Sequence, residues 1–288
     1  MIPDGYNIFP MSVPSTTRDY TQPENAALLL PDYDMLDEYQ GYIYDTMLEM
    51  LQKPNEYKHT GDGCSEELKY GKVKVLSPEY QADGDALTHC VGITYELFIR
   101  SHMKYMKAHE SYLKPYDVDP KFWGKPEWHG RAYWFRYNSF PEYGQGAAAG
   151  TIALYAHLRD RWADYQQAEV KAGKEDPGDF LWYNAQIVEP WEMEFGAQIQ
   201  LQYETNMLGR GHAVTFVGYE VRKTRDGKEW LCARVFDSNY NKDYGMKYGI
   251  KFSWYLLGRW DDQGNWIAWK NRDGSDRRAH ASNVFYHL

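Results

Sequence analysis

The spacing of the apolar residues changes near Pro190, and this change constrains the fold more than any other feature of the chain. Before Pro190, apolar residues repeat at steps of three and four, which is typical of helices, whereas after it they alternate, which is typical of strands. The expected helices are residues 32–52, 87–112 and 147–172. The expected strands are residues 199–203, 212–221, 230–236, 249–257 and 266–269. Helices followed by strands predict an α+β protein whose helices pack on an antiparallel sheet, rather than an alternating parallel sheet.

Three further segments lack a regular period. Residues 1–31 are rich in Pro, Ser, Thr, Asn and Tyr and predict an extended N-terminal arm. Residues 53–84 are polar and predict mostly loop, whereas residues 115–146 carry many aromatic rings and predict an aromatic insertion. Because no repeat or linker divides the rest of the chain, residues 32–288 are expected to form a single domain.

The charge of the chain excludes several classes of partner. Its net charge of −9 repels nucleic acid and anionic membrane surfaces, and no stripe of Lys and Arg offsets it, so no nucleic-acid partner is expected. No apolar run of about 18 residues is present, so no membrane span is expected. The first 23 residues lack a basic segment followed by an apolar one, so no signal peptide is expected. No feature of the sequence indicates an oligomeric state.

Three cysteines are present, and they are Cys64, Cys90 and Cys232. An odd number of cysteines is a poor framework for disulfides, so at least one thiol is left free. The chain has no Cys-x-x-Cys pair and no tight His/Cys cluster of the kind that binds zinc. Neither a metal nor a cofactor is therefore expected.

Cys90 is the candidate nucleophile. It lies in the segment 85–96, where the second expected helix begins. In the first turn of a helix, the exposed N–H groups and the helix dipole stabilise a thiolate and lower the pKa of the thiol. The same N–H groups can hold an oxyanion that forms later in a reaction. The alternative interpretation is that Cys90 is a small buried apolar residue, as free cysteines often are.

His212 is the candidate base. It opens an expected strand directly after a loop that contains Gly209 and Gly211, so its ring can face a groove while residues 213–217 anchor the strand. A thiol nucleophile requires such a base close by. The alternative is a solvent-facing or hydrogen-bonded histidine, because the chain has nine histidines in all.

A third residue is needed to orient the base. The pair Asp226-Gly227 predicts a hairpin turn, so the strand that follows it should run back beside His212. A simple antiparallel register places Asn241 or Asn239 opposite His212 and Asp237 one diagonal step away, all on the same face. We expect Asn239 in this role, with Asp237 second, and a single bulge in either strand would change the choice.

Two segments together resemble a known superfamily. Residues 211–214, Gly-His-Ala-Val, with Gly-Tyr at 218–219, resemble the histidine strand of papain-like cysteine peptidases, and the order Cys, His, Asn or Asp is also theirs. Residues 89–92, His-Cys-Val-Gly, resemble the Asp-Cys-Ser-Gly helix start of NlpC-type peptidoglycan endopeptidases, which also carry a tyrosine at the place of Tyr80. The chain departs from these families at His89 and Val91, and it lacks the glutamine that papain itself carries shortly before the cysteine.

This resemblance implies a papain-like or NlpC-like fold and a cysteine-dependent hydrolysis of amide bonds. The implied substrate is a peptide or a peptidoglycan-like molecule, and the implied location is secreted or periplasmic. The N–H group of Cys90 would hold the oxyanion, with Tyr80 or His89 as a second donor. Two alternatives stay open: a transglutaminase-like acyl transferase, for which Asp237 suits the third position, and a non-catalytic binding module on a degraded hydrolase fold.

Overall fold

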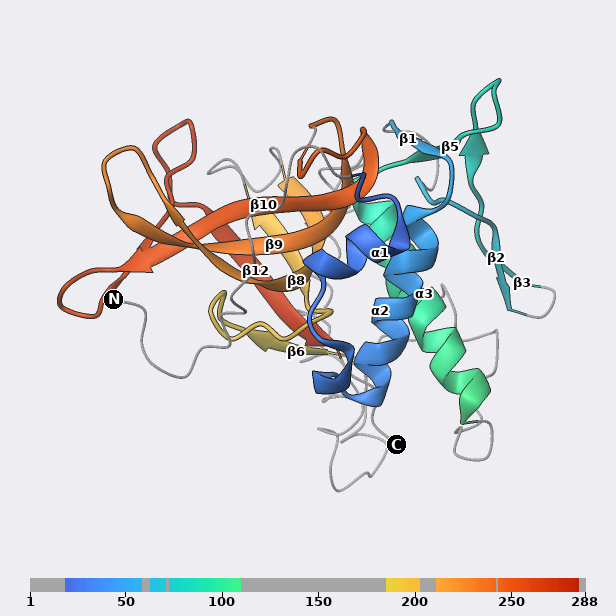
Figure 1. Ribbon diagram of the computed structural model, residues 1–288, viewed down its shortest axis with the longest axis horizontal. Coiled ribbons are helices and arrows are strands. Elements are labelled where there is room, and N and C mark those ends of the chain that lie inside the picture. Colours follow the sequence, from blue (N-terminus) through green and yellow to red (C-terminus); the bar gives the residue numbers. More distant parts are fainter. Residues whose placement is uncertain are drawn as a thin grey trace, which may run out of the picture.

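The structure is a computed structural model that describes residues 19–58, 63–70, 73–109, 185–202, 211–241 and 243–284. Within these ranges, two helices pack against one face of a seven-stranded antiparallel sheet (Figure 1), so the predicted α+β class is confirmed. The expected aromatic insertion at 115–146 and the expected helix at 147–172 lie outside the described residues.

The described residues form three α-helices and two 3-10 helices. They are α1 (Pro23–Ala26), η1 (Ala27–Leu29), η2 (Tyr33–Met35), α2 (Glu38–Leu51) and α3 (Cys90–Ala108), where η marks a 3-10 helix. The long helix α2 starts later than expected because Asp37 and Gln40 form a capping box: the Asp37 carboxylate accepts from the Gln40 N–H at 2.7 Å, and the Gln40 side chain accepts from the Asp37 N–H at 3.2 Å. None of the helices that the structure describes has the length and apolar character needed to cross a membrane.

The main sheet contains the strands that the alternating pattern predicted, with two additions. Its strands are β6 (Ala185–Val188), β7 (Gln198–Gln202), β8 (Gly211–Lys223), β9 (Glu229–Asn239), β10 (Gly249–Trp260), β11 (Trp266–Ala268) and β12 (Arg278–Val284). Their order is β11-β10-β9-β8-β7-β12-β6, and every neighbouring pair is antiparallel. The predicted turn joins β8 to β9, and Gly227 occupies it with φ of 81°, a conformation that glycine adopts without strain. Strands β6 and β12 were not predicted.

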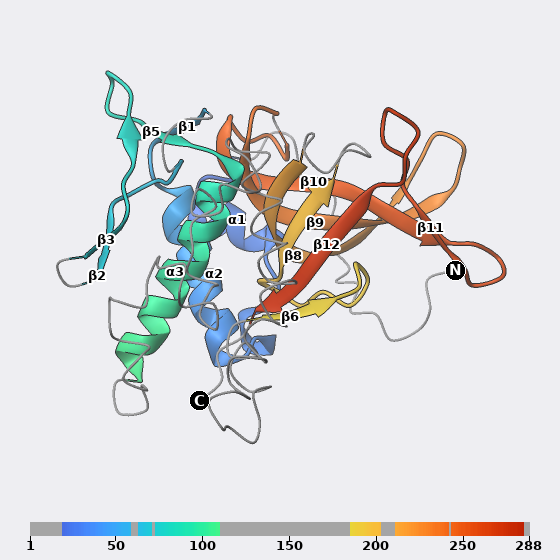
Figure 2. The same cartoon turned by 180° about the vertical axis from the view of Figure 1, so that it is seen from behind.

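Both faces of the main sheet are buried. Side chains alternate between the two faces of a strand, so the neighbours Val235 and Phe236 in β9 enter different cores. Phe236 packs with Phe252, Met47 and the other residues between the sheet and the helices α2 and α3. Val235 packs on the opposite face in a second cluster, which also contains Val214. Figure 2, seen from behind, shows α2 and α3 side by side along the same face of the sheet.

A second, small sheet leads into α3. Residues 53–84 were expected to be mostly loop; the described part does lie largely outside regular structure, but it also contains short strands that were not predicted. The strands are β1 (Asn55–Tyr57), β2 (Leu68–Tyr70), β3 (Val73–Leu76), β4 (Glu79–Tyr80) and, just beyond this segment, β5 (Ala86–Thr88). Strand β5 lies between β1 and β4, while β2 and β3 form a separate hairpin. The Asn55 side chain accepts from the N–H of Ile250 at 2.7 Å and so ties β1 to β10. Strands of two to four residues are too short to show an alternating pattern.

The N-terminal segment is part of the folded core. Residues 1–31 were expected to be an extended arm, but the described part, residues 19–31, forms the short helices α1 and η1. Tyr20, Ala26 and Leu29 are buried in the same core as α2. The buried Arg234 of β9 also donates to the carbonyl oxygen of Leu29 at 3.0 Å. The prediction of an arm is therefore wrong for residues 19–31.

Candidate active site

Cys90 is the first residue of α3. Only His89 separates the end of β5 at Thr88 from the helix, so the thiol lies in the first helical turn, as predicted. Cys90 is only 1% exposed and contacts Val91 and Ala213 of β8. The first N–H groups of a helix have no carbonyl partner within the helix, so they are available to hold negative charge on a thiolate or an oxyanion.

His89 caps the helix and contacts the thiol. Its Nδ1 accepts from the N–H of Gly92 at 3.3 Å, so Nε2 carries the proton when the ring is neutral. Its side chain also forms a hydrogen bond with that of Cys90. The N–H of His89 donates to the carbonyl oxygen of Gly63 at 3.0 Å. Gly63 has φ of +62°, and a Cβ atom there would lie 2.0 Å from Cδ2 of the His89 ring, so only glycine fits.

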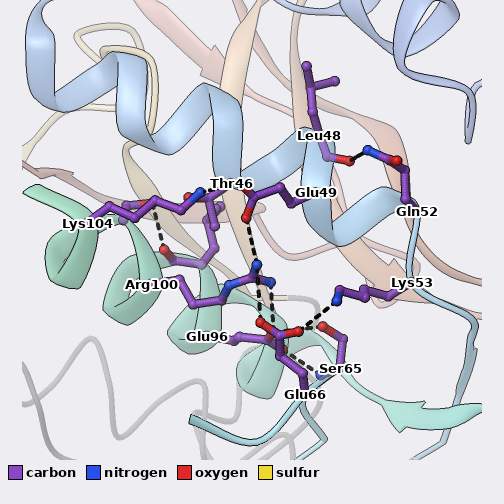
Figure 3. A network of polar contacts seen from close by, with 12 residues as sticks. Thr46, Leu48, Glu49, Gln52, Lys53, Ser65, Glu66, Glu96, Arg100 and Lys104 are labelled. Atoms are coloured by element: carbon purple, nitrogen blue, oxygen red, sulfur yellow. Dashed lines mark hydrogen bonds and ion pairs between the residues drawn. The ribbon is translucent and has the colours of Figure 1, made fainter. Parts of the chain in front are cut away.

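A buried ionic network holds the segment that supports His89 (Figure 3). The N–H and hydroxyl of Ser65 donate to the Glu96 carboxylate at 2.5 and 2.7 Å, which ties residues 63–65 to the middle of α3. Arg100, one turn further along α3, donates to Glu96 at 3.3 Å and to Glu49 of α2 at 2.8 Å. Burial raises the pKa of Glu96, while the Ser65 hydrogen bonds and Arg100 oppose that rise. The network thus fixes the start of α3 relative to α2.

His212 lies beside the thiol and changes its acidity. It is the second residue of β8, 6% exposed, and its side chain is hydrogen bonded to that of Cys90. Burial alone raises the pKa of Cys90, but the charge and hydrogen bond of His212, together with the smaller effect of His89, lower it to about 5. Cys90 is therefore a thiolate at neutral pH, which is the reactive form of cysteine.

Asp237 of β9 occupies the other side of the His212 ring. Its Oδ2 lies 2.7 Å from Nε2 of His212, which leaves Nδ1 as the ring nitrogen that faces Cys90. The carboxylate is completely buried, and burial raises its pKa, but the hydrogen bond and charge of His212, then Lys251 and Ser253, reverse this effect. The net pKa is lowered, so Asp237 is ionised and fixes the orientation of the His212 ring.

Asn239, the residue first expected to orient His212, has a different place. A bulge between Phe216 and Gly218 shifts the register of β8 on β9, and the register beyond it, extended from the pair Thr215–Phe236, puts Asn239 opposite His212. Its amide nevertheless donates to Asp237, with Nδ2 at 3.2 Å from Oδ2. Nε2 of His212 donates instead to the diagonal residue Asp237, so the expected order of the two candidates for the orienting role is reversed.

The remaining predicted residues lie further out. Asn241 is exposed, and its N–H donates to Oδ1 of Asn239 at 2.6 Å. Tyr80 lies in β4 and is 58% exposed. Among the contacts of the described residues, none joins Tyr80 to Cys90, so of the two proposed second oxyanion donors only His89 reaches the thiol.

Three residues of the site were not predicted, and all lie on β10. Ser253 donates to Oδ1 of Asp237 at 2.8 Å, and the hydroxyl of Tyr255 donates to Oδ2 at 3.1 Å. Lys251 is completely buried beside them. The sequence did contain a signal, because Lys251, Ser253 and Tyr255 alternate with apolar residues in β10, so the three polar side chains lie on one face of the strand.

The site therefore combines a helix-terminal cysteine, a histidine and a buried aspartate across the end of an antiparallel sheet. Comparison of the chain with family models, with curated proteins and with solved structures found no match. Among the described residues, no group of three or more His, Cys, Asp or Glu side chains is arranged to hold a metal ion. We therefore base the function on the residues of the site.

Proposed function

We propose that the protein is a cysteine-dependent enzyme that cleaves amide bonds, with Cys90 as nucleophile, His212 as its acid and base, and Asp237 as the residue that orients His212. One observation carries this proposal: the side chains form a continuous chain of hydrogen bonds from Cys90 through His212 to Asp237. A buried thiol with a pKa of about 5 is rare among structural cysteines, whose burial normally raises the pKa.

The proposed reaction proceeds through an acyl-enzyme. The Cys90 thiolate attacks the carbonyl carbon of the substrate, and the carbonyl electron pair moves to oxygen, where the N–H of Cys90 and the His89 ring donate to it. The tetrahedral adduct collapses, the C–N bond breaks, and His212 gives its proton to the leaving amine. His212 then takes a proton from water, the resulting hydroxide attacks the thioester, and the acid leaves as the thiolate and imidazolium are restored. Each oxyanion donor is worth about 3 kcal/mol.

The proposed class is that of papain-like cysteine peptidases, nearest to the NlpC type. Three features support it: the order Cys90, His212, Asp237 along the chain, the cysteine at a helix start, and the histidine at the start of a sheet strand. The proposed substrates are peptide or isopeptide bonds, with bacterial cell-wall peptides first, and a secreted or periplasmic location would follow from such a substrate.

An acyl transferase of the transglutaminase type is the second candidate. The observation that favours it is the contact of an aspartate, rather than an asparagine, with His212. The same thioester would then be resolved by an amine instead of water. Ammonia release together with incorporation of an added amine would distinguish this reaction from hydrolysis.

A binding module on a degraded hydrolase fold is the third candidate. The observation that favours it is the low exposure of Cys90, at 1%, because a substrate carbonyl must reach the sulfur before it can react. This candidate predicts that no small electrophile labels Cys90.

The proposal is tested by incubation with peptidoglycan fragments and with peptides, with and without an added amine, followed by mass spectrometry of products and protein. We expect cleavage products, and a thioester on Cys90 when the reaction is quenched in acid. Cys90→Ala should abolish both, whereas Cys232→Ala, which removes a buried thiol outside the site, should retain them. Equal product formation by the native protein and Cys90→Ala would contradict the proposal.

A further inference from the structure

Lys251 lies behind the candidate active site, on the side away from Cys90. It is the direct cross-strand partner of Asp237, so the two side chains share one face of the sheet. Lys251 is completely buried, which is rare for a lysine unless its charge is paired. Burial lowers the pKa of Lys251, and Asp237 and Asp243 act in the opposite direction.

The ammonium group of Lys251 fixes the amide of Asn239. Its Nζ donates to the carbonyl oxygen of Asn239 at 3.2 Å and to its side-chain Oδ1 at 3.3 Å. The N–H of Asn241 donates to the same Oδ1 at 2.6 Å. Because Oδ1 accepts from both donors, the amide must turn its NH2 group the other way, toward Asp237 and Tyr255.

Asn239 and its neighbours in turn hold the Asp237 carboxylate. Asp237 Oδ2 accepts from Nδ2 of Asn239 at 3.2 Å, from the hydroxyl of Tyr255 at 3.1 Å and from Nε2 of His212 at 2.7 Å. Nδ2 of Asn239 also donates to the Tyr255 hydroxyl at 2.9 Å, and Ser253 donates to Oδ1 of Asp237. A carboxylate with donors on both oxygens has a fixed rotamer and stays ionised.

The charges along this path balance. The Cys90 thiolate and the His212 imidazolium form one pair, and Asp237 and Lys251 form a second, so these four groups together carry no net charge. Without Lys251, one buried negative charge would be uncompensated, and a buried charge without a partner is strongly unfavourable. Asp243 is the other acidic group that acts on Lys251, and burial raises the pKa of Asp243.

We propose that Lys251 is a positioning residue of this site: through Asn239 it orients the Asp237 carboxylate, and by its charge it keeps that carboxylate ionised beside His212. The inference rests on the proposed function, because it assigns Lys251 to the same Cys90–His212–Asp237 chain. A lysine that only stabilises the fold would leave the acidity of Cys90 unchanged.

The test is the pH profile of Cys90 alkylation in Lys251→Met. Loss of the positive charge lets Asp237 take up a proton at higher pH. The acid limb of the profile, which is the pH range where the alkylation rate rises with pH, should therefore move up by about one pH unit. At a given pH on that limb, the rate should fall about tenfold. Lys251→Arg keeps the charge and should return the limb toward its native position. The matched control is Arg234→Met, which removes an equally buried cation paired with Glu220 and should leave the profile unchanged.

If Lys251→Met does not fold, Asn239→Ala takes its place, because it removes both the link from Lys251 and the Nδ2 donor to Asp237, so its acid limb should also move up. An acid limb at the native pH in folded Lys251→Met, or in Asn239→Ala, would overturn the inference. The profile of the native protein separates this failure from failure of the proposed function. If the acid limb of native Cys90 lies near pH 5 and the variants share it, only the role of Lys251 is removed. If native Cys90 titrates as an ordinary thiol, the active site itself is removed.

Discussion

Nε2 of His212 lies 2.7 Å from Oδ2 of the fully buried Asp237. This contact fixes which ring nitrogen faces Cys90, and it provides a negative charge beside the imidazolium of the proposed ion pair. The acidity of Cys90 thus depends on a carboxylate that does not touch it.

Replacement of Asp237 by asparagine should therefore impair Cys90 without removing a contact to it. Asp237→Asn keeps the shape of the side chain but loses the charge and favours the wrong ring tautomer, a change that costs on the order of 10⁴-fold in rate in a Ser-His-Asp triad. The measurement is kcat/KM on the best substrate found. Asp226→Asn, in the exposed turn between β8 and β9, is the control and should keep native activity; equal losses in both variants would contradict the role of Asp237.

A methyl group at Gly63 should displace the His89 ring. Gly63→Ala places a Cβ 2.0 Å from Cδ2 of His89 at a positive φ, so we expect slower alkylation of Cys90 as well as lower stability. Gly84→Ala is a matched control, because Gly84 has φ of +92° but no atom within 4 Å. Both variants should lose about 1–2 kcal/mol from backbone strain, measured by denaturant unfolding, and only Gly63→Ala should change the alkylation rate. Native alkylation in Gly63→Ala would contradict the proposed support of Cys90 by His89.

Breaking the buried contacts of Glu96 should lower the free energy of unfolding far more than breaking the partly exposed ion pair between Lys104 and Glu49. Glu96→Ala removes the acceptor of Ser65 and leaves the buried Arg100 with fewer partners, so we expect a loss of about 3–5 kcal/mol in the free energy of unfolding. Lys104→Ala breaks a 2.7 Å ion pair with Glu49 that is partly exposed, and it should cost about 1 kcal/mol or less. Similar losses in the two variants, measured by urea denaturation, would show that the network does not hold α3.

The sequence allowed the main elements of the fold to be predicted, and it supplied five candidate residues that the structure brings together: Cys90, His212, Asp237, Asn239 and His89. Long amphipathic segments have a clear period, so α2, α3 and the central strands were found. Cys90 and His212 were identified because each lies at the start of an element, where a functional side chain can reach beyond the regular backbone. The α+β class followed from the order of the two kinds of segment.

The features of the fold and the site that were not predicted depend on contacts between residues far apart in the sequence. The choice between Asp237 and Asn239 turned on side-chain geometry, because both residues lie on the same face of β9. Oδ2 of Asp237 lies 2.7 Å from Nε2 of His212, whereas the amide of Asn239 donates to Asp237. The two-residue strand β4 forms because β5 pairs with it, not because of its own pattern. Tyr20 is buried in the core that also contains residues of α2 and α3, which no local period in its own segment indicates.

The central claim is tested most directly by the pH dependence of Cys90 alkylation with a small reagent, followed peptide by peptide in the native protein and in His212→Ala. Because the pKa of Cys90 is lowered to about 5, the native rate should rise through that pH and reach its plateau before neutrality. In His212→Ala the thiol loses its main cationic partner, so the rise should move toward the ordinary thiol pKa of about 8.5 or above. The same ordinary pKa in both proteins, or no labelling of native Cys90 at any pH, would contradict the claim that Cys90 and His212 form an activated pair.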